Sequence, residues 1–222
     1  MQIRIPYTPR KFQNYLHQRI RDYRWSVLVC HRRFGKTVCM INHLLMAALT
    51  SKVSNPRYAY IAPTFKQAKS IAWDYIKQFT HKIPGVRFNE TELRVDLPNK
   101  ARITLLGSEN CDGLRGIYLD GCVIDEYANV NDRLFPEIIR PALSDRKGFC
   151  IFIGTPQGMN NNFYELFQHA KGADDWFYFK AKASETKVVD QDELTKAKEV
   201  MGENKFKQEF ECDWIANIEG SI

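Results

Sequence analysis

The sequence predicts an α/β protein whose sheet is mostly parallel and flanked by helices. Short apolar segments rich in β-branched residues alternate with segments whose apolar residues recur at helical spacing. Strands that alternate with helices build a mostly parallel sheet that is covered on both faces. One strand-like segment also leads directly into CHRRFGKT at residues 30–37, which ends like a phosphate-binding loop and opens a helix.

The strand-like segments are short, apolar and bounded by turn residues. Strands are expected at residues 25–30, 58–62, 121–125, 149–153 and 176–183. Residues 86–106 have a different pattern, because apolar and polar residues alternate there around the turn Pro98-Asn99-Lys100. This alternation predicts a small antiparallel meander.

Helices are expected between the strands, where apolar residues recur at helical spacing. They cover residues 37–49, 65–79, 131–143 and 160–170. The second is expected to bury one face made of Phe65, Ala68, Ile71, Ala72, Tyr75 and Phe79. Further along, Asp190 with Glu193 resembles a helix N-cap with its box partner, and Gly202 is expected to end that helix. The chain is therefore divided into a core at residues 1–184 and a small helical lid or linker at 185–222.

Composition limits the classes of protein to consider. The 222 residues, 44% hydrophobic and 26% charged, suit one soluble α/β domain with a small appendage. No apolar run is long enough to span a membrane, and the N-terminus lacks the apolar core of a signal peptide, so a cytoplasmic protein is expected. The six cysteines form no C-x-x-C pair and are expected to be buried reduced thiols. A net charge of +6 permits nucleic-acid contact without demanding it.

The segment CHRRFGKT departs from the usual phosphate-loop pattern, because Cys30 stands where the first glycine is expected. That position donates little charge, whereas Gly35 must let the backbone wrap closely around a phosphate. Lys36 would reach the β- and γ-phosphates of a nucleotide, and Thr37 would place its hydroxyl on Mg²⁺. The predicted nucleotide-binding residues of the loop are Arg33, Phe34, Gly35, Lys36, Thr37 and Val38. The alternative is an inert strand-to-helix turn with an exposed lysine.

A second motif supports the nucleotide site. Residues 122–126, CVIDE, form an apolar strand that ends in Asp125 and Glu126. Two acids at the end of a buried strand are costly unless they are paired or bind a ligand. We therefore expect Asp125 to hold Mg²⁺ and Glu126 to activate the attacking water. The long separation from Lys36 leaves room for an extra strand between the two motif strands, which is typical of the RecA/ASCE-like P-loop NTPase sheet. A surface turn is the alternative for the two acids.

Taken together, the motifs resemble the ATPase of viral large terminases, the motors that package DNA into preformed capsids. The similar parts are Arg32 inside the loop, CVIDEYA at residues 122–128 and IGTPQG at residues 153–158. The resemblance runs from Gln13 to about Trp214. It implies a Mg²⁺-dependent ATPase, with ATP and Mg²⁺ as cofactors, that drives double-stranded DNA into a capsid.

The resemblance also implies roles for individual residues. Gln13 matches a glutamine that reads adenine, with Phe12 or Tyr15 near the base. Arg32 matches a loop arginine that senses the γ-phosphate, and Thr155 matches a motif that couples the phosphate state to movement. The alternatives are an ordinary amphipathic helix around Gln13, a surface phosphate contact for Arg32 and a plain turn at Thr155.

A further arginine stands in the glycine-flanked segment Gly113-Leu114-Arg115-Gly116. In a ring, such an arginine can reach the nucleotide of the neighbouring subunit, where it neutralises charge that develops on the transferred phosphoryl group. The predicted catalytic residues are thus Glu126, Arg32 and Arg115. The alternative for Arg115 is a loop arginine that contacts DNA phosphate or nothing.

The resemblance implies double-stranded DNA, a capsid portal and a small terminase subunit as partners, and no membrane. It implies a homo-oligomeric ring, expected to be a pentamer, with a monomer in isolation and a place in the host cell cytoplasm at the procapsid. No nuclease activity is expected in this chain, because it ends at FECDWIANIEGSI, where the ATPase would lead into a nuclease domain. The competing hypotheses are a helicase-like ATPase dependent on nucleic acid and a non-catalytic P-loop scaffold that binds DNA or capsid.

Overall fold

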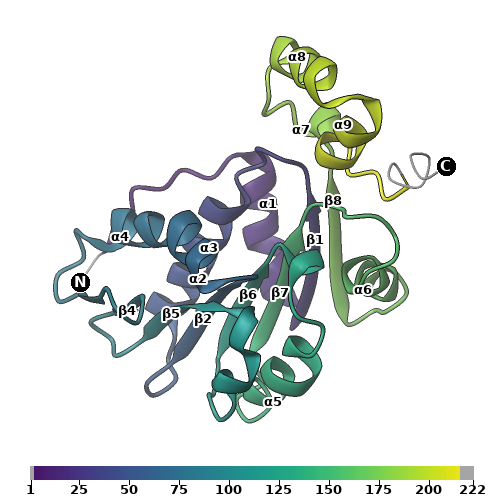
Figure 1. Cartoon of the computed structure of the whole chain (residues 1–222). Helices are drawn as coiled ribbons and strands as arrows, with labels where there is room; N and C mark the ends of the chain where they lie inside the picture. The colour runs from purple at the N-terminus through teal and green to yellow at the C-terminus, as the bar shows by residue number, and fades with distance from the viewer. Residues whose placement is uncertain (1–2, 216–222) are drawn as a thin grey trace.

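A central sheet with helices on both faces organises the molecule (Figure 1). The computed structural model describes residues 3–215. Across the sheet the strands follow the order β3-β4-β5-β2-β6-β7-β1-β8. Their bounds are β1 Trp25–Cys30, β2 Arg57–Ala62, β3 Arg87–Asn89, β4 Arg94–Asp96, β5 Arg102–Gly107, β6 Gly121–Asp125, β7 Phe149–Gly154 and β8 Trp176–Ala181. The fold class predicted from the sequence is confirmed.

Neighbouring strands are parallel from β5 across to β8, whereas β3 pairs antiparallel with β4 and β4 pairs antiparallel with β5. The predicted meander over residues 86–106 is therefore confirmed. Strand β7 lies between β1 and β6. The predicted extra strand between the two motif strands is confirmed as well, and it brings the carboxyl ends of all three strands to one edge.

Two apolar cores, one on each face of the sheet, hold the helices in place. Along β1, Leu28 and Cys30 belong to the core under α2, whereas Val27 and Val29 belong to the core under α6. A strand buried on both faces needs a continuous apolar run, as this segment has. The α-helices are α1 Lys11–Arg19, α2 Lys36–Thr50, α3 Phe65–Ala68, α4 Asp74–Thr80, α5 Arg140–Ala142, α6 Asn162–Lys171, α7 Ala183–Thr186, α8 Gln191–Met201 and α9 Glu203–Phe210. The 3₁₀ and π segments are η1 Ile20–Asp22, η2 Lys69–Trp73, η3 Ser108–Leu114, η4 Tyr127–Asn129 and η5 Leu134–Ile139.

The prediction of one regular buried face over residues 65–79 is wrong. The π segment η2 separates α3 from α4 and changes the phase of the helix. Trp73 is consequently buried, while Phe65, Ile71 and Tyr75 are 38%, 37% and 39% exposed. A π turn adds a residue to one turn of the helix, which a 3.6-residue periodicity does not reveal. A similar π segment, η5, occupies much of the predicted helix at 131–143.

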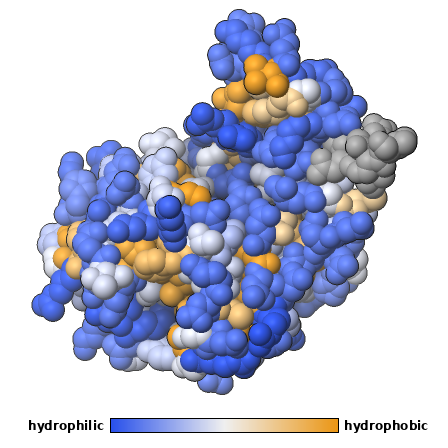
Figure 2. All heavy atoms as spheres, in the orientation of Figure 1, coloured by the Kyte–Doolittle hydropathy of each residue, from blue (hydrophilic) through white to orange (hydrophobic). Residues whose placement is uncertain are grey.

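Helices α7–α9 form a small unit beyond β8, at the top of Figure 1. It has a small core of its own made of Ala183, Leu194 and Phe210. Figure 2 shows hydrophobic atoms at its surface, and Val200 of α8 is 89% exposed. The division at residue 184 remains a prediction, and residues 216–222 of the predicted linker lie outside the described part.

The predicted caps of α8 are partly correct. The side chain of Asp190 accepts a hydrogen bond from the Asp192 N–H, and Gly202 ends the helix with a φ of +79°. The expected box partner Glu193 instead pairs with Lys196 at 3.7 Å. All six cysteines are buried, as predicted. Within residues 3–215, the structure contains no helix with the length and apolar character that crossing a membrane requires.

Candidate active site

The loop between β1 and α2 has the shape that a phosphate cradle requires. Gly35 immediately precedes α2 and has a φ of +88°, which favours glycine. A Cβ at this position would lie 2.8 Å from Nε2 of Gln13. Arg33, two residues earlier, also has a left-handed φ of +69°. The N–H groups that open α2, at residues 36–38, have no acceptor within their own helix turn and are suited to bind an anion.

Lys36 reaches from the loop to the end of β7. Its Nζ donates to Oγ1 of Thr155 at 3.1 Å and to the Cys30 carbonyl at 3.4 Å. The Thr155 hydroxyl lies 3.3 Å from the same carbonyl and donates to it. Thr155 is only 4% exposed. The structure therefore brings the predicted phosphate-binding lysine and the predicted coupling residue into direct contact, because β7 pairs with β1.

Asp125 and Glu126 lie side by side at the carboxyl end of β6. Asp125 is 3% exposed, and its two carboxylate oxygens accept from the Glu126 N–H at 2.9 Å and from the Tyr60 hydroxyl. Glu126 has a left-handed φ of +48°, an uncommon conformation outside glycine that concentrates at functional sites. Burial, followed by the charge of Asp125, raises the pKa of Glu126, while the positive charge of Lys36 acts in the opposite direction.

These residues surround one hollow of about 290 Å³. It is lined by Arg33, Gly35, Lys36, Thr37, Val38, Ile71, Tyr75, Asp125 and Glu126. Ile71 and Tyr75 were missed by sequence reasoning, which assigned them to a buried helix face. The π segment η2 turns them outward, and no signal in the apolar periodicity could have revealed it.

Arg32 is exposed and lies against the small helical unit. Its backbone N–H donates to the Glu209 carbonyl at 2.7 Å, and its guanidinium lies 3.9 Å from the Glu209 carboxylate. The preceding His31 is buried, and its Nε2 lies 2.7 Å from the Thr186 hydroxyl. The loop is thus joined to α7 and α9. Glu209 was not predicted, because nothing in its local sequence distinguishes it from other helical glutamates.

Gln13 of α1 lies beside the loop and is buried. Its Nε2 donates to the Gly35 carbonyl at 3.2 Å, and its Oε1 accepts from the Arg10 N–H at 2.9 Å. Phe12 and Tyr15 are placed elsewhere. Their rings pack against Phe179 of β8, with centroid distances of 6.3 and 5.8 Å. The structure therefore brings Gln13 to the loop, and it places the two aromatic residues on the β8 side of α1.

Arg115 follows η3 on the surface and is half exposed. Its guanidinium pairs with Asp112 at 3.2 Å and with Glu137 at 3.1 Å. Arg133 joins the same carboxylates. These partners hold Arg115 within an exposed charge cluster rather than in the hollow around Lys36.

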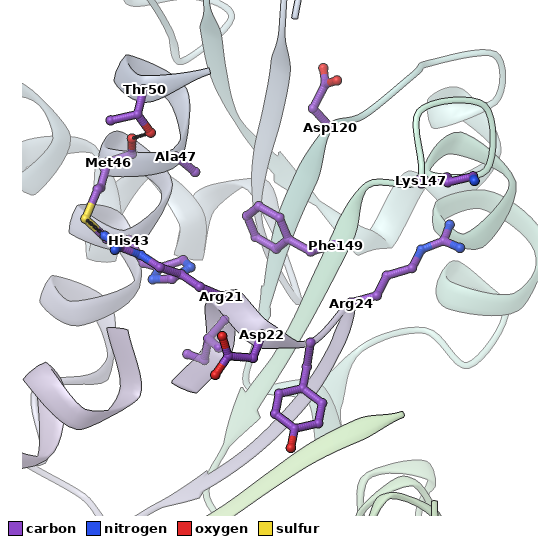
Figure 3. A pocket seen from close by; sticks show the side chains of 12 residues that line it. Arg21, Asp22, Arg24, His43, Met46, Ala47, Thr50, Asp120, Lys147 and Phe149 are labelled. Carbon is purple, nitrogen blue, oxygen red and sulfur yellow. Dashed lines mark hydrogen bonds between the residues drawn. The ribbon is translucent and has the colours of Figure 1, made fainter. Parts of the chain in front are cut away.

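A second and larger hollow of about 700 Å³ opens at the opposite edge of the sheet (Figure 3). Its lining includes Arg24 just before β1, Asp120 just before β6 and Phe149 at the start of β7. It therefore lies at the amino ends of the strands, whereas ligands of open α/β sheets bind outside the carboxyl ends. None of the predicted site residues lines it. We therefore assign the smaller hollow at the loop as the candidate active site.

Comparisons with known proteins show the family to which this chain belongs. Residues 29–222 match the family model described as "Terminase large subunit, T4likevirus-type, N-terminal". The chain is 26% identical over 208 residues to the terminase large subunit of Escherichia phage T5, which covers 90% of this chain and 46% of that protein. It is 31% identical over 126 residues to the terminase large subunit of Thermus virus P23-45, covering 48% and 26%. The chain thus spans less than half the length of these relatives.

Solved structures show the same fold at low sequence identity. The large terminase ATPase domain of Thermus phage P74-26 superposes with a TM-score of 0.81 at 22% identity, covering 95% of this chain and 96% of that one. The large terminase of another thermophilic bacteriophage, in complex with ADP, gives a TM-score of 0.79 at 14% identity, covering 92% and 53%. The family match extends over most of the chain and includes both motifs. The chain therefore belongs to the family of phage terminase large subunits, of which it corresponds to the N-terminal part.

Proposed function

We propose that this chain is the ATP-hydrolysing motor domain of a phage large terminase that drives double-stranded DNA into a capsid. The observation that carries the proposal is the convergence of Lys36, Thr37, Asp125 and Glu126 around one hollow at the carboxyl ends of β1 and β6. Relatives of the same fold are described as an ATPase domain and as complexes with ADP and ATP-gamma-S. Their low identity supports the fold, and the hydrolytic activity of this chain is our inference from its own residues.

Phosphate binding would use the loop amides and Lys36. The present partners of the Lys36 ammonium group are a hydroxyl and a carbonyl, both neutral. A polyphosphate would offer this cation a charged partner, and charge-assisted hydrogen bonds are roughly twice as strong as neutral ones. Lys36 would therefore move from Thr155 to the β- and γ-phosphates when ATP binds. Gln13, next to Gly35, is proposed to contact the adenine.

The residues around Asp125 suit a divalent cation. Its hydrogen-bond donors, the Glu126 N–H and the Tyr60 hydroxyl, are neutral, and within residues 3–215 it has no ion-pair partner. A carboxylate that is 3% exposed without a counter-charge is costly. Asp125 and the hydroxyl of Thr37 would hold Mg²⁺, which is bound through oxygen ligands together with nucleotide phosphates. Mg²⁺ would supply positive charge that offsets the charge developing on the phosphates.

Glu126 is the proposed general base. Its raised pKa makes its carboxylate a better proton acceptor than an exposed glutamate, and its left-handed backbone turns it out of the strand beside Asp125. It would orient the attacking water and accept its proton. Arg32, whose side chain is 61% exposed beside Glu209, would stabilise the γ-phosphate, and Arg115 would act on the nucleotide of a neighbouring subunit.

Coupling to movement would pass through the end of β7. Thr155 contacts Lys36, and Gln157 accepts a hydrogen bond from Gln208 of α9 at 3.3 Å. A change in the phosphate state at Lys36 would therefore reach both the β7 end and the small helical unit. We propose that α7–α9 tilt in response and that the motor grips DNA through its backbone, without strong sequence preference.

The proposed assembly is a homo-oligomeric ring, expected to be a pentamer, that acts at the procapsid in the host cytoplasm with a capsid portal and a small terminase subunit. The isolated chain is expected to be a monomer without nuclease activity. Gel-filtration mass measurement and incubation with plasmid DNA and Mg²⁺ test these two expectations directly.

Substitution of Glu126 tests the proposed reaction. Glu126→Gln should retain ATP binding by calorimetry and lose ATP turnover, with or without double-stranded DNA, because the amide cannot accept the proton of the attacking water. Glu165→Gln on the exposed face of α6 is the matched control and should turn over ATP normally. Wild-type turnover in Glu126→Gln would refute the base assignment. Failure of the wild-type chain to bind nucleotide would favour a non-catalytic scaffold.

A further inference from the structure

Tyr60 is a fully buried residue at the centre of the sheet, close to the candidate active site. It lies on β2, next to β6, where its register partner is Val123. Asp125 stands two residues after Val123 on β6, so the side chains of Val123 and Asp125 point to the same face of the sheet as Tyr60. Diagonal neighbours of this kind lie within reach of an aromatic side chain. The register of β2 and β6 thus directs the Tyr60 phenol toward the Asp125 carboxylate.

The Tyr60 hydroxyl contacts Asp125, one of the two residues proposed to hold the cation. It donates a hydrogen bond to Oδ2 of Asp125, while Oδ1 accepts from the Glu126 N–H. Both carboxylate oxygens are thereby fixed in direction, and each retains a lone pair for a further ligand.

We propose that Tyr60 is a positioning residue for the cation side of the active site, whose hydroxyl holds the Asp125 carboxylate in a fixed direction at the hollow. This inference rests on the proposed function, because it assumes that Asp125 and Thr37 hold Mg²⁺. Groups that orient metal ligands act on metal affinity without touching the ion, and their loss typically lowers that affinity by about 10- to 100-fold. Tyr60 would not contact the nucleotide itself.

The test separates cation binding from nucleotide binding. The dissociation constant of ADP is measured by calorimetry with Mg²⁺ and again with EDTA. The ratio of the constant in EDTA to the constant with Mg²⁺ reports how much the cation contributes to ADP affinity. Tyr60→Phe removes only the hydroxyl, and we expect it to reduce this ratio by about tenfold while the constant in EDTA stays unchanged. Asp125→Asn should reduce the ratio at least as strongly.

Tyr58→Phe is the matched control. Tyr58 lies on the same strand and face, is also buried, and donates its hydroxyl to the Ala47 carbonyl at 3.3 Å, away from the loop. It should leave the ratio unchanged. An unchanged ratio in Tyr60→Phe, even with a lowered melting temperature, would overturn the inference, since the hydroxyl would then serve stability alone. An unchanged ratio in Asp125→Asn would overturn the proposed cation site itself.

A measurement on the unsubstituted chain covers the case in which Tyr60→Phe does not fold. Fluorotyrosine can be incorporated at position 60 alone, and in a second sample at position 58 alone, and observed by ¹⁹F NMR. Addition of Mg²⁺ to the ADP complex should shift the resonance of residue 60 and leave that of residue 58 in place. A residue-60 resonance that does not respond to Mg²⁺ would contradict the proposal.

Discussion

The two edges of the sheet carry hollows of opposite character. We call the side of the sheet where the parallel strands end the carboxyl edge, and the side where they begin the amino edge. At the carboxyl edge the hollow is small, but its charged groups have neutral partners. Lys36 donates to a hydroxyl and a carbonyl, and Asp125 accepts from an N–H and a phenol. At the amino edge the hollow is larger, and its two carboxylates already have charged partners within the protein. Asp120 pairs with Arg146 at 3.4 Å, and Asp22 pairs with Arg19 at 3.3 Å.

This difference supports the proposal that the hollow at the carboxyl ends of the strands is the active site. A buried charge whose partners are neutral gains most when a charged ligand arrives, whereas a charge already paired within the fold gains little. Cavity volume therefore does not identify the active site here, and the kind of partner that each charged group has is more informative. The amino edge is best understood as a structural region that holds the strand starts in place.

The largest expected effect comes from the charge of the phosphate loop. Lys36→Ala should lower ATP turnover by about 10²–10³ or more, because a cation aimed at the negative charge that develops on the phosphates is lost. Steady-state phosphate release measures the change. Lys147→Ala at the amino-edge hollow is the matched control and should keep wild-type turnover. An equal loss in both variants would remove the distinction between the two edges.

Arg115 should matter only when chains assemble. Arg115→Ala is expected to leave nucleotide binding by the isolated chain unchanged and to reduce turnover in assemblies by up to about 10³, the range of a trans-acting arginine. Mixing it with Glu126→Gln subunits should restore part of the activity, because each variant supplies what the other lacks. If no mixing ratio restores activity, Arg115 does not act between subunits.

A buried histidine pair between α1 and α2 should make the stability of the fold depend on pH. Nδ1 of His17 lies 3.1 Å from Nδ1 of His43, and their rings are stacked. Burial lowers the pKa of His17 to about 4 and that of His43 to about 3, and the positive charge of Arg21 adds to both shifts. The folded state therefore keeps both rings neutral while the unfolded chain binds protons below pH 6.5.

The free energy of unfolding should consequently be highest above pH 6.5 and fall as the pH drops toward 4. Each histidine contributes a loss of about 2 kcal/mol between pH 6.5 and pH 5. Urea titrations at several pH values measure this slope. His43→Leu should flatten it, whereas His81→Gln, at an exposed position, should leave it as in the wild type. A slope unaffected by His43→Leu would mean that other groups control acid unfolding.

The smallest effect is expected at the amino edge. Asp120→Asn should lower the free energy of unfolding by about 1–3 kcal/mol, because the Asp120 carboxylate accepts from the Arg57 N–H at 2.7 Å and pairs with Arg146. Nucleotide affinity should remain unchanged. Denaturant unfolding and ADP calorimetry on the same sample check both statements, and a weakened ADP affinity would show that the two edges communicate.

Much of the fold could be predicted from local pattern. The strands β1 and β6 begin and end where the apolar runs do, since a strand buried on both faces needs an unbroken apolar segment. The predicted residues Lys36, Thr37, Asp125 and Glu126 line one hollow because their motifs follow strands whose carboxyl ends meet at one edge. Their chemical roles, like those of Gln13, Arg32, Arg115 and Thr155, remain predictions for the experiments above.

Other features depend on events that no local pattern reports. Ile71 and Tyr75 face the hollow because a π turn shifts the helix phase, and apolar residues at those positions look like core in the sequence. Tyr60 meets Asp125 only through the register of β2 against β6. Glu209 meets Arg32 only because α9 folds back onto the loop.

By itself, the sequence determined which residue types stand at the ends of the apolar strands, and with them the class of fold and the family. Residue type and spacing are properties of the chain alone, so they can be read before it folds. Only the tertiary structure decided which groups those residues meet, from the phenol on Asp125 to the hydroxyl on Lys36. Hydrogen bonds act over about 3 Å, and residues far apart in sequence reach that distance only through strand register and helix packing.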